Sequence, residues 1–268
     1  MTQNKWMFLL VLITLVALGG CTASQKEQIQ QVKTNQANED LAKQTDPLEG
    51  FNRAMWTLNR DYLDKFFLKP LTQVYVAITP QIIRNGLLNA AENLEEPANT
   101  INNLLQLKPD DSLASLSRFA INSTVGVFGI FDVAGEIGIE RQEEDFAQVL
   151  GSYGISSGPY IMLPALGPSD PRDFVGSVVD RYYWPETILE DQYTIIAGVI
   201  RLIEVRALLL QQEELLNRSL DPYIFVRDVY FQQSAFELSD GELGEQTEEE
   251  QQEEEDDFAD FEALLEGV

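Results

Sequence analysis

The sequence predicts an all-α fold for its central part, residues 46–236, and three observations support this. Apolar residues recur at spacings of three and four, which is the period of a helix face. Prolines stand where helices would begin, as in Thr79-Pro80 and Asp221-Pro222, and proline is tolerated in the first turn of a helix but not in its interior. Alternating strand patterns are almost absent. We therefore expect short helices joined by turns.

The N-terminus has the pattern of a secretory signal peptide. Lys5 precedes an apolar run over residues 6–18, which is too short to cross comfortably a hydrocarbon layer that takes roughly 20 residues. Gly19, Gly20 and Cys21 follow, and Cys21 is the only cysteine of the chain. The pattern resembles a bacterial lipoprotein cleavage site, so we expect residues 1–20 to be removed and Cys21 to be acylated. A free thiol is the alternative. Thr22 after the cysteine, by resemblance to enterobacterial sorting, favours the outer membrane.

Residues 21–45 form the next segment. They are rich in Gln, Asn and Lys and contain few large apolar residues. This composition is typical of a chain that does not fold alone. We expect a flexible, disordered tether between the lipid and the helical domain at 46–236, with a span of roughly 27 Å for a coil of about 24 residues.

A helix over residues 80–94 is predicted to have two distinct faces. Ile83, Leu87 and Ala90 fall on one side of a helical wheel, and the side chains on the other side form a polar ladder of Asn85, Asn89 and Asn93. The ladder is either a solvated face or a polar lining that contacts lipid head groups.

Residues 119–139 are also apolar, but Gly126, Gly129, Gly135 and Gly138 interrupt them. We expect a bent hairpin, either packed against other helices or lying at membrane depth within protein, because a straight spanning helix would not carry so many glycines.

A helix over residues 193–216 is apolar around most of its circumference, with Arg201, Glu204, Gln211 and Gln212 in one sector. Such a helix is buried in a protein core or lies in lipid. Both outcomes remain open for a lipid-anchored chain.

Residues 154–158 match the G-x-S-x-G pattern of hydrolase nucleophile elbows. The elbow needs a histidine partner and a following helix, whereas this chain has no histidine and Pro159 comes next. Gly154 and Gly158 are better explained by backbone freedom in a turn. We expect this segment, which includes Ser156, Pro159 and Tyr160, to be a hairpin that turns at Gly154 and Gly158, either mobile or static.

The composition excludes several other functions. No histidine and a single cysteine exclude Ser-His-Asp catalysis, zinc-thiolate clusters and disulfides within the chain. The net charge of -26 opposes nucleic-acid binding. No nucleotide or calcium motif is present, so we expect no enzyme, no cofactor and no metal.

Residues 237–268 contain many Asp and Glu but no Lys or Arg. Such a block repels itself and buries little apolar surface, which predicts a disordered acidic tail. Phe258, Phe261, Leu264 and Leu265 near its end could form a short docking helix.

Several segments of the central part occur in an order that points to one known family. The opening string 46–56, DPLEGFNRAMW, is the most specific of them. The others are Arg84-Asn85-Gly86, Asn93-Leu94-Glu95-Glu96-Pro97, Arg118-Phe119 with Asn122, Phe131-Asp132-Val133-Ala134-Gly135, Gly151-Ser152-Tyr153-Gly154, Gly158-Pro159-Tyr160 with Leu163-Pro164, Gly167-Pro168-Ser169 with Arg172-Asp173, and Asp221-Pro222-Tyr223-Ile224 with Val226-Arg227. Together they resemble the MlaA (VacJ) family of outer-membrane phospholipid-transport lipoproteins.

The resemblance implies a ring of helices embedded in the inner leaflet of the outer membrane, on its periplasmic side, with a central amphipathic channel. It also implies a trimeric porin and a periplasmic phospholipid carrier as partners. In such a protein, phospholipids mislocalised to the outer leaflet pass through the channel to the carrier, which maintains lipid asymmetry. The segment 154–160 is then expected to be a mobile hairpin that helps to gate the channel, with Gly154 and Gly158 as hinges, and an ordinary static turn is the alternative. The alternative is a helical scaffold lipoprotein that transports nothing.

Overall fold

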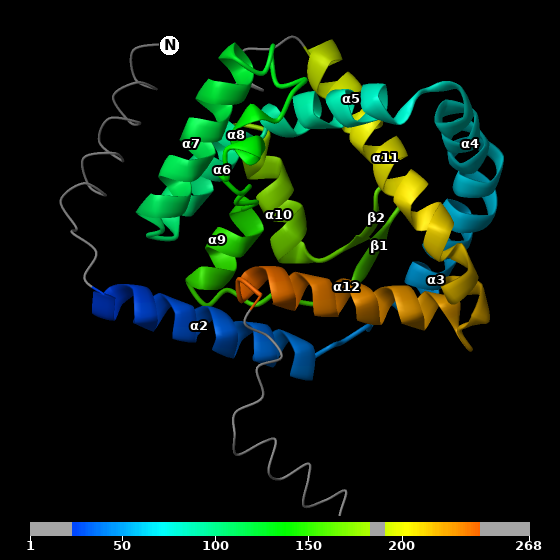
Figure 1. The fold of residues 1–268 in the computed structure, drawn as a ribbon. Coiled ribbons are helices and arrows are strands. Elements are labelled where there is room, and N and C mark those ends of the chain that lie inside the picture. The colour runs from blue at the N-terminus through cyan, green and yellow to red at the C-terminus, as the bar shows by residue number, and fades with distance from the viewer. Residues whose placement is uncertain (1–22, 183–190, 242–268) are drawn as a thin grey trace, which may run out of the picture.

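The computed structural model describes residues 23–182 and 191–241 (Figure 1). The predicted signal peptide, Cys21 and most of the acidic tail lie outside these residues. The described chain is helical, as predicted, with one small pair of strands. Its helices are α2 (Ala23–Ala42), α3 (Glu49–Thr57), the π-helix η1 (Leu58–Leu68), α4 (Lys69–Ile78), α5 (Gln81–Asn93), α6 (Glu96–Leu105), α7 (Pro109–Thr124), α8 (Val133–Glu136), α9 (Phe146–Ser152), α10 (Pro171–Asp180), α11 (Asp191–Arg218) and α12 (Pro222–Leu238).

The helices are arranged as a ring-like frame (Figure 1). In this view α5 forms the upper edge, α4 and α3 follow on the right, α12 lies along the lower edge, and α6, α7 and α9 close the left side. The long helix α11 crosses from α5 toward α12 and contacts α4, α5 and α12. None of the described helices is both long and apolar enough to cross a bilayer.

Proline and aspartate begin several of these helices, as the sequence predicts. Asp170 and Asp221 precede Pro171 and Pro222, and both carboxylates accept hydrogen bonds from backbone N–H groups in the first turn, which would otherwise lack partners. The predicted start at Thr79-Pro80 differs, because Pro80 itself is the residue before α5 and no side chain caps that helix.

One short hairpin was not predicted. Strands β1 (Ile161–Leu163) and β2 (Gly167–Ser169) pair in antiparallel register, with Met162 opposite Pro168. Asn52 of α3 holds the free side of β1, since its side chain accepts from Met162 N (2.9 Å) and donates to Tyr160 O (3.0 Å). A strand of three residues is too short for an alternating pattern to be visible in the sequence.

The prediction of a flexible tether over residues 21–45 is wrong for the residues that the structure describes, because residues 23–42 form helix α2. This helix packs against α12 and α9. Its sequence is polar all round, and it is ordered because its polar side chains find partners far along the chain. Lys33 is fully buried and its Nζ lies 2.7 Å from Asp240 Oδ1, and Gln30 donates to Ser239 O.

The predicted boundary between the domain and the acidic tail at 236/237 is also wrong by a few residues. Helix α12 continues to Leu238, which is buried beside Ala37 and Ala235. Asp240 pairs with Lys33 and Lys108. The folded body therefore includes residues 237–241.

Candidate functional site

The exposed surface of the described residues is rich in large apolar side chains. Leu208 on α11 is 60% exposed, Phe67 on η1 is 70% exposed, and Phe128 after α7 is 82% exposed. Among the buried side chains of the described residues, polar and charged ones outnumber apolar ones. A water-soluble protein shows the opposite arrangement, and extended exposed apolar surface marks contact with lipid or with a partner. The body is therefore built for apolar surroundings.

Helix α11 shows how this arrangement is achieved. Its polar side chains Arg201 and Glu204 are turned toward neighbouring parts of the body. Arg201 pairs with Glu95, and Glu204 pairs with Arg84, with 2.5 Å between Oε2 and Nη2. Complete burial of this helix in a core, one of the two outcomes the sequence left open, is wrong. Its exposed large apolar side chains are Ile195, Ile196, Val199, Leu202, Val205, Leu208, Leu209 and Leu215.

The interior is held together by ion pairs and amide hydrogen bonds. Arg118 of α7 donates to Glu96 of α6, to Asp132, and to the carbonyl of Ile139. Asn122, one turn further along α7, also donates to Asp132. Burial raises the pKa of Glu96 although Arg118 opposes the shift. This network fixes the segment around α8 (131–139) onto α6 and α7, so the predicted bent hairpin at 119–139 is confirmed.

The predicted asparagine ladder is divided between different environments. Asn85 is exposed and accepts a hydrogen bond from Gln81, and Asn89 is partly exposed and donates to Ile130 O. Asn93 is buried against Gly129 and donates to Ser123, so it is a packing residue and its prediction as polar lining is wrong. A lining role for Asn85 and Asn89 stays a prediction.

The opposite, apolar stripe of the same helix is also exposed. Ile83 is 51% exposed, and Leu87 is 36% exposed, whereas Arg84 and Gly86 are buried. The periodicity therefore identified an apolar stripe, but that stripe is exposed, and the buried residues of α5 are Arg84, Gly86, Ala91 and Asn93, which are polar or small. The exposure of apolar side chains agrees with the surface of α11.

The predicted hairpin at 154–160 is a loop between α9 and β1. Gly154 and Gly158 both have positive φ, 81° and 84°, as a glycine turn requires. Ser156 donates to Asp40, and Tyr160 is completely buried. After Pro159 the chain enters a strand, not the helix that a nucleophile elbow needs. The hinge role of the two glycines stays a prediction.

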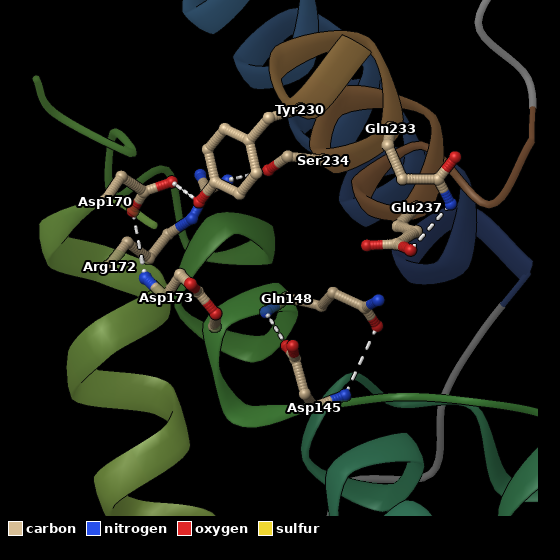
Figure 2. A pocket seen from close by; sticks show the side chains of 10 residues that line it. Asp145, Gln148, Asp170, Arg172, Asp173, Tyr230, Gln233, Ser234 and Glu237 are labelled. Carbon is tan, nitrogen blue, oxygen red and sulfur yellow. Dashed lines mark hydrogen bonds between the residues drawn. The ribbon is translucent and has the colours of Figure 1, made fainter. Parts of the chain in front are cut away.

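A polar cavity of about 70 Å³ lies between α9, α10 and α12 (Figure 2). Asp145 accepts from the backbone of Gln148, and Asp170 accepts from the hydroxyl of Tyr230. Burial raises the pKa of Asp145 to about 7, and the nearby carboxylates Asp180, Asp173 and Glu237 contribute to this shift. The cavity has room for a few water molecules and not for a lipid.

Comparisons with known proteins identify this architecture. The family model described as MlaA lipoprotein matches residues 44–237. The chain belongs to this family. The Escherichia coli K12 protein named "Intermembrane phospholipid transport system lipoprotein MlaA" is 37% identical over 84% of this chain and 90% of its own length. The protein of the same name from Haemophilus influenzae is 33% identical over 90% of this chain and 93% of its own length.

A solved structure of the family also matches. It is described as "Structural basis for maintenance of bacterial outer membrane lipid asymmetry", and it superposes with a TM-score of 0.69 at 38% sequence identity. The match covers 73% of this chain and 100% of the solved chain. The family model spans α3 to α12, so helix α2 lies before the residues that it matches.

Sequence reasoning did not predict that polar residues organise the interior of this MlaA-family protein. Asn52, Arg118 and Asn122 were named only as part of the family resemblance, and Asp40 was not singled out. Asp40, Asn52 and Arg118 are buried, but in a sequence they look like residues of a solvated face. Arg118 and Asn122 lie four residues apart, on one face of α7, and both point to Asp132, so their spacing was a further signal.

Proposed function

We propose that this protein is an outer-membrane lipoprotein of intermembrane phospholipid transport. It removes mislocalised phospholipids from the outer leaflet and passes them to a periplasmic carrier, which maintains the lipid asymmetry of the outer membrane. The observation that carries the proposal is the reversed distribution of side chains, with apolar residues outside and ion pairs inside. The names of the relatives support the same activity.

The proposed location is the inner leaflet of the outer membrane, on the periplasmic side, with acylated Cys21 as the anchor. An anchor with two or more acyl chains is sufficient for stable attachment, whereas one chain is marginal. The exposed side chains of η1, α4 and α11 would then meet acyl chains. A body that lies within one leaflet needs no spanning helix. A trimeric porin beside the ring and a soluble periplasmic phospholipid carrier are the proposed partners.

The proposed mechanism is selective passage, and no covalent bond is broken. A phospholipid head group loses its hydration when it enters hydrocarbon, which costs several kcal/mol per unsatisfied polar group. An amphipathic channel lowers this barrier because polar groups such as Asn85 and Asn89 replace water while the tails remain on apolar surface. The loop at 154–160 is the proposed gate.

A non-transporting scaffold is the second candidate. It would use the same anchor and the same apolar surface, but phospholipid would not move. The exposed apolar surface fits both candidates, whereas the activity named for the relatives favours transport.

Deletion of the gene separates the two candidates. Transport predicts that phospholipid accumulates in the outer leaflet of the deletion strain and that the acylated protein restores the normal content. A Cys21→Ser variant, expressed at the same level, should not restore it. An outer leaflet that stays free of phospholipid after deletion would leave only the scaffold.

A further inference from the structure

Helix α2 reaches the loop 154–158 through one side chain, Asp40. The carboxylate of Asp40 accepts from Ser156 Oγ at 2.9 Å and from Ser157 N at 3.3 Å. It also accepts from Arg172 Nη1 of α10 at 2.8 Å. The same nitrogen of Arg172 donates to Ile155 O at 3.0 Å. Asp40 and Arg172 thus bind three successive residues of the loop.

This contact is buried although the loop around it is exposed. The side chains of Asp40 and Arg172 are 6% and 4% exposed. Ile155 and Ser156 are exposed, and a Cβ added at Gly154 would meet nothing within 4 Å. A segment with so little packing of its own needs a partner to keep one conformation. The buried ion pair supplies that partner.

The rest of α2 is fixed independently of the loop. Lys33 pairs with Asp240, and Gln30 donates to Ser239 O, both at the end of α12. Because these contacts hold the helix against the body, Asp40 presents its carboxylate from a rigid support. The helix also begins two residues after Cys21, so it joins the proposed lipid anchor directly to the loop.

We propose that Asp40 is a positioning residue: α2, which lies before the part of the chain that the family model matches, holds residues 155–157 in the position in which phospholipid passes. The expected effect on transport rests on the proposed function. The contact between Asp40 and the loop does not. Release of the loop should slow the removal of phospholipid, because a loop that samples many positions spends less time in the productive one.

The test compares two substitutions that remove the same charge from adjacent residues of α2. Asp40→Asn weakens the contacts with Arg172 and the loop. Glu39→Gln is the matched control, because Glu39 is exposed and pairs with Lys43. Ser156→Ala is a second, milder variant that removes one hydrogen bond and leaves the buried ion pair intact.

The first readout is local mobility, measured by electron paramagnetic resonance with a spin label on Ile155→Cys. Ile155 is 47% exposed, and the only native cysteine is the predicted acylation site. We expect the immobilised component of the spectrum to be lost in Asp40→Asn, reduced in Ser156→Ala and unchanged in Glu39→Gln. A label on Leu116→Cys of α7, which is also exposed, should report no change in any of them.

The second readout is the phospholipid content of the outer leaflet in cells that express each variant. We expect it to rise in Asp40→Asn and to stay normal in Glu39→Gln. An unchanged label spectrum in Asp40→Asn and Ser156→Ala overturns the proposal, and so does a mobile loop with normal lipid removal. If the outer leaflet of the deletion strain contains no phospholipid, the proposed function is wrong. The spectrum of the label at position 155 would then be the only measurement that decides whether Asp40 holds the loop.

Discussion

Arg118 and Glu96 form an ion pair inside the helical body, with 2.8 Å between Nε and Oε1 and side chains that are only 6% and 1% exposed. Removing one partner of such a pair leaves a buried charge without compensation. We expect Arg118→Met to lower the free energy of unfolding by about 3–5 kcal/mol. The measurement is denaturant unfolding of the protein in detergent micelles.

The control for this prediction is an ion pair on the surface. Arg218 and Glu214 pair along α11, but both side chains are 76% exposed. Arg218→Met should cost less than about 1 kcal/mol because exposed pairs are weak. Equal losses in the two variants would contradict a special role for the buried pair.

Gly129 should not tolerate a side chain. Its φ is 86°, and an added Cβ would lie 2.6 Å from Cβ of Asn93. Gly138 has a similar φ of 89° but open space around it. Gly138→Ala should therefore cost about 1 kcal/mol from backbone strain alone, whereas Gly129→Ala should cost a further 1–3 kcal/mol or so from overpacking. Thermal unfolding of both variants in the same detergent measures the difference, and equal melting temperatures would count against it.

The acidic tail should be dispensable only beyond Gly241. Truncation after residue 241 is expected to leave helix content, melting temperature and membrane fractionation nearly unchanged. Truncation after Phe236 removes buried Leu238 and the Asp240 carboxylate that pairs with Lys33 and Lys108. Loss of a buried leucine alone costs about 2–5 kcal/mol. A shorter chain that melts at the same temperature as the longer one would show that these contacts contribute little.

Asp145 should make stability depend on pH. Its pKa is raised in the folded chain to about 7 from an ordinary value of 3.8, mainly by burial. The stabilisation linked to its bound proton is therefore complete below pH 3.8 and is lost as the pH rises through about 7. We expect the melting temperature to fall between pH 5 and pH 8, and to fall less in Asp145→Asn, which keeps an amide oxygen as helix cap.

Other buried carboxylates contribute to the same pH dependence. Burial also raises the pKa values of Glu96, Glu144, Asp170, Asp180 and Glu237, so Asp145→Asn should keep a residual slope. Asp110→Asn is the control, because the Asp110 side chain is 88% exposed at the start of α7. A slope that is identical in the native protein and in Asp145→Asn would exclude Asp145 as its source.

Local features of this fold could be predicted from the sequence because they depend on local chemistry. Proline after aspartate marked the start of α12, and the apolar run at 193–216 marked α11. The positive φ values of Gly154 and Gly158 follow from the same local rule. These signals need no knowledge of what surrounds the helix.

The rest could not be predicted, because it depends on partners distant in the chain and on the surroundings. Helix α2 has a composition typical of a coil, and it is ordered by residues more than a hundred positions away, such as Arg172 and Asp240. Periodicity found the apolar stripe of α5 but could not show that this stripe is exposed. That depends on whether water or an apolar phase lies outside.

The exposed apolar residues also bear on how the chain reaches its destination. A lipoprotein of the outer membrane must cross an aqueous compartment, and there Phe67, Phe128 and Leu208 would face water. Folded molecules in that state would associate with one another through these side chains. The proposed location therefore implies an escort that shields this surface until the bilayer takes its place, and purified protein without detergent should precipitate.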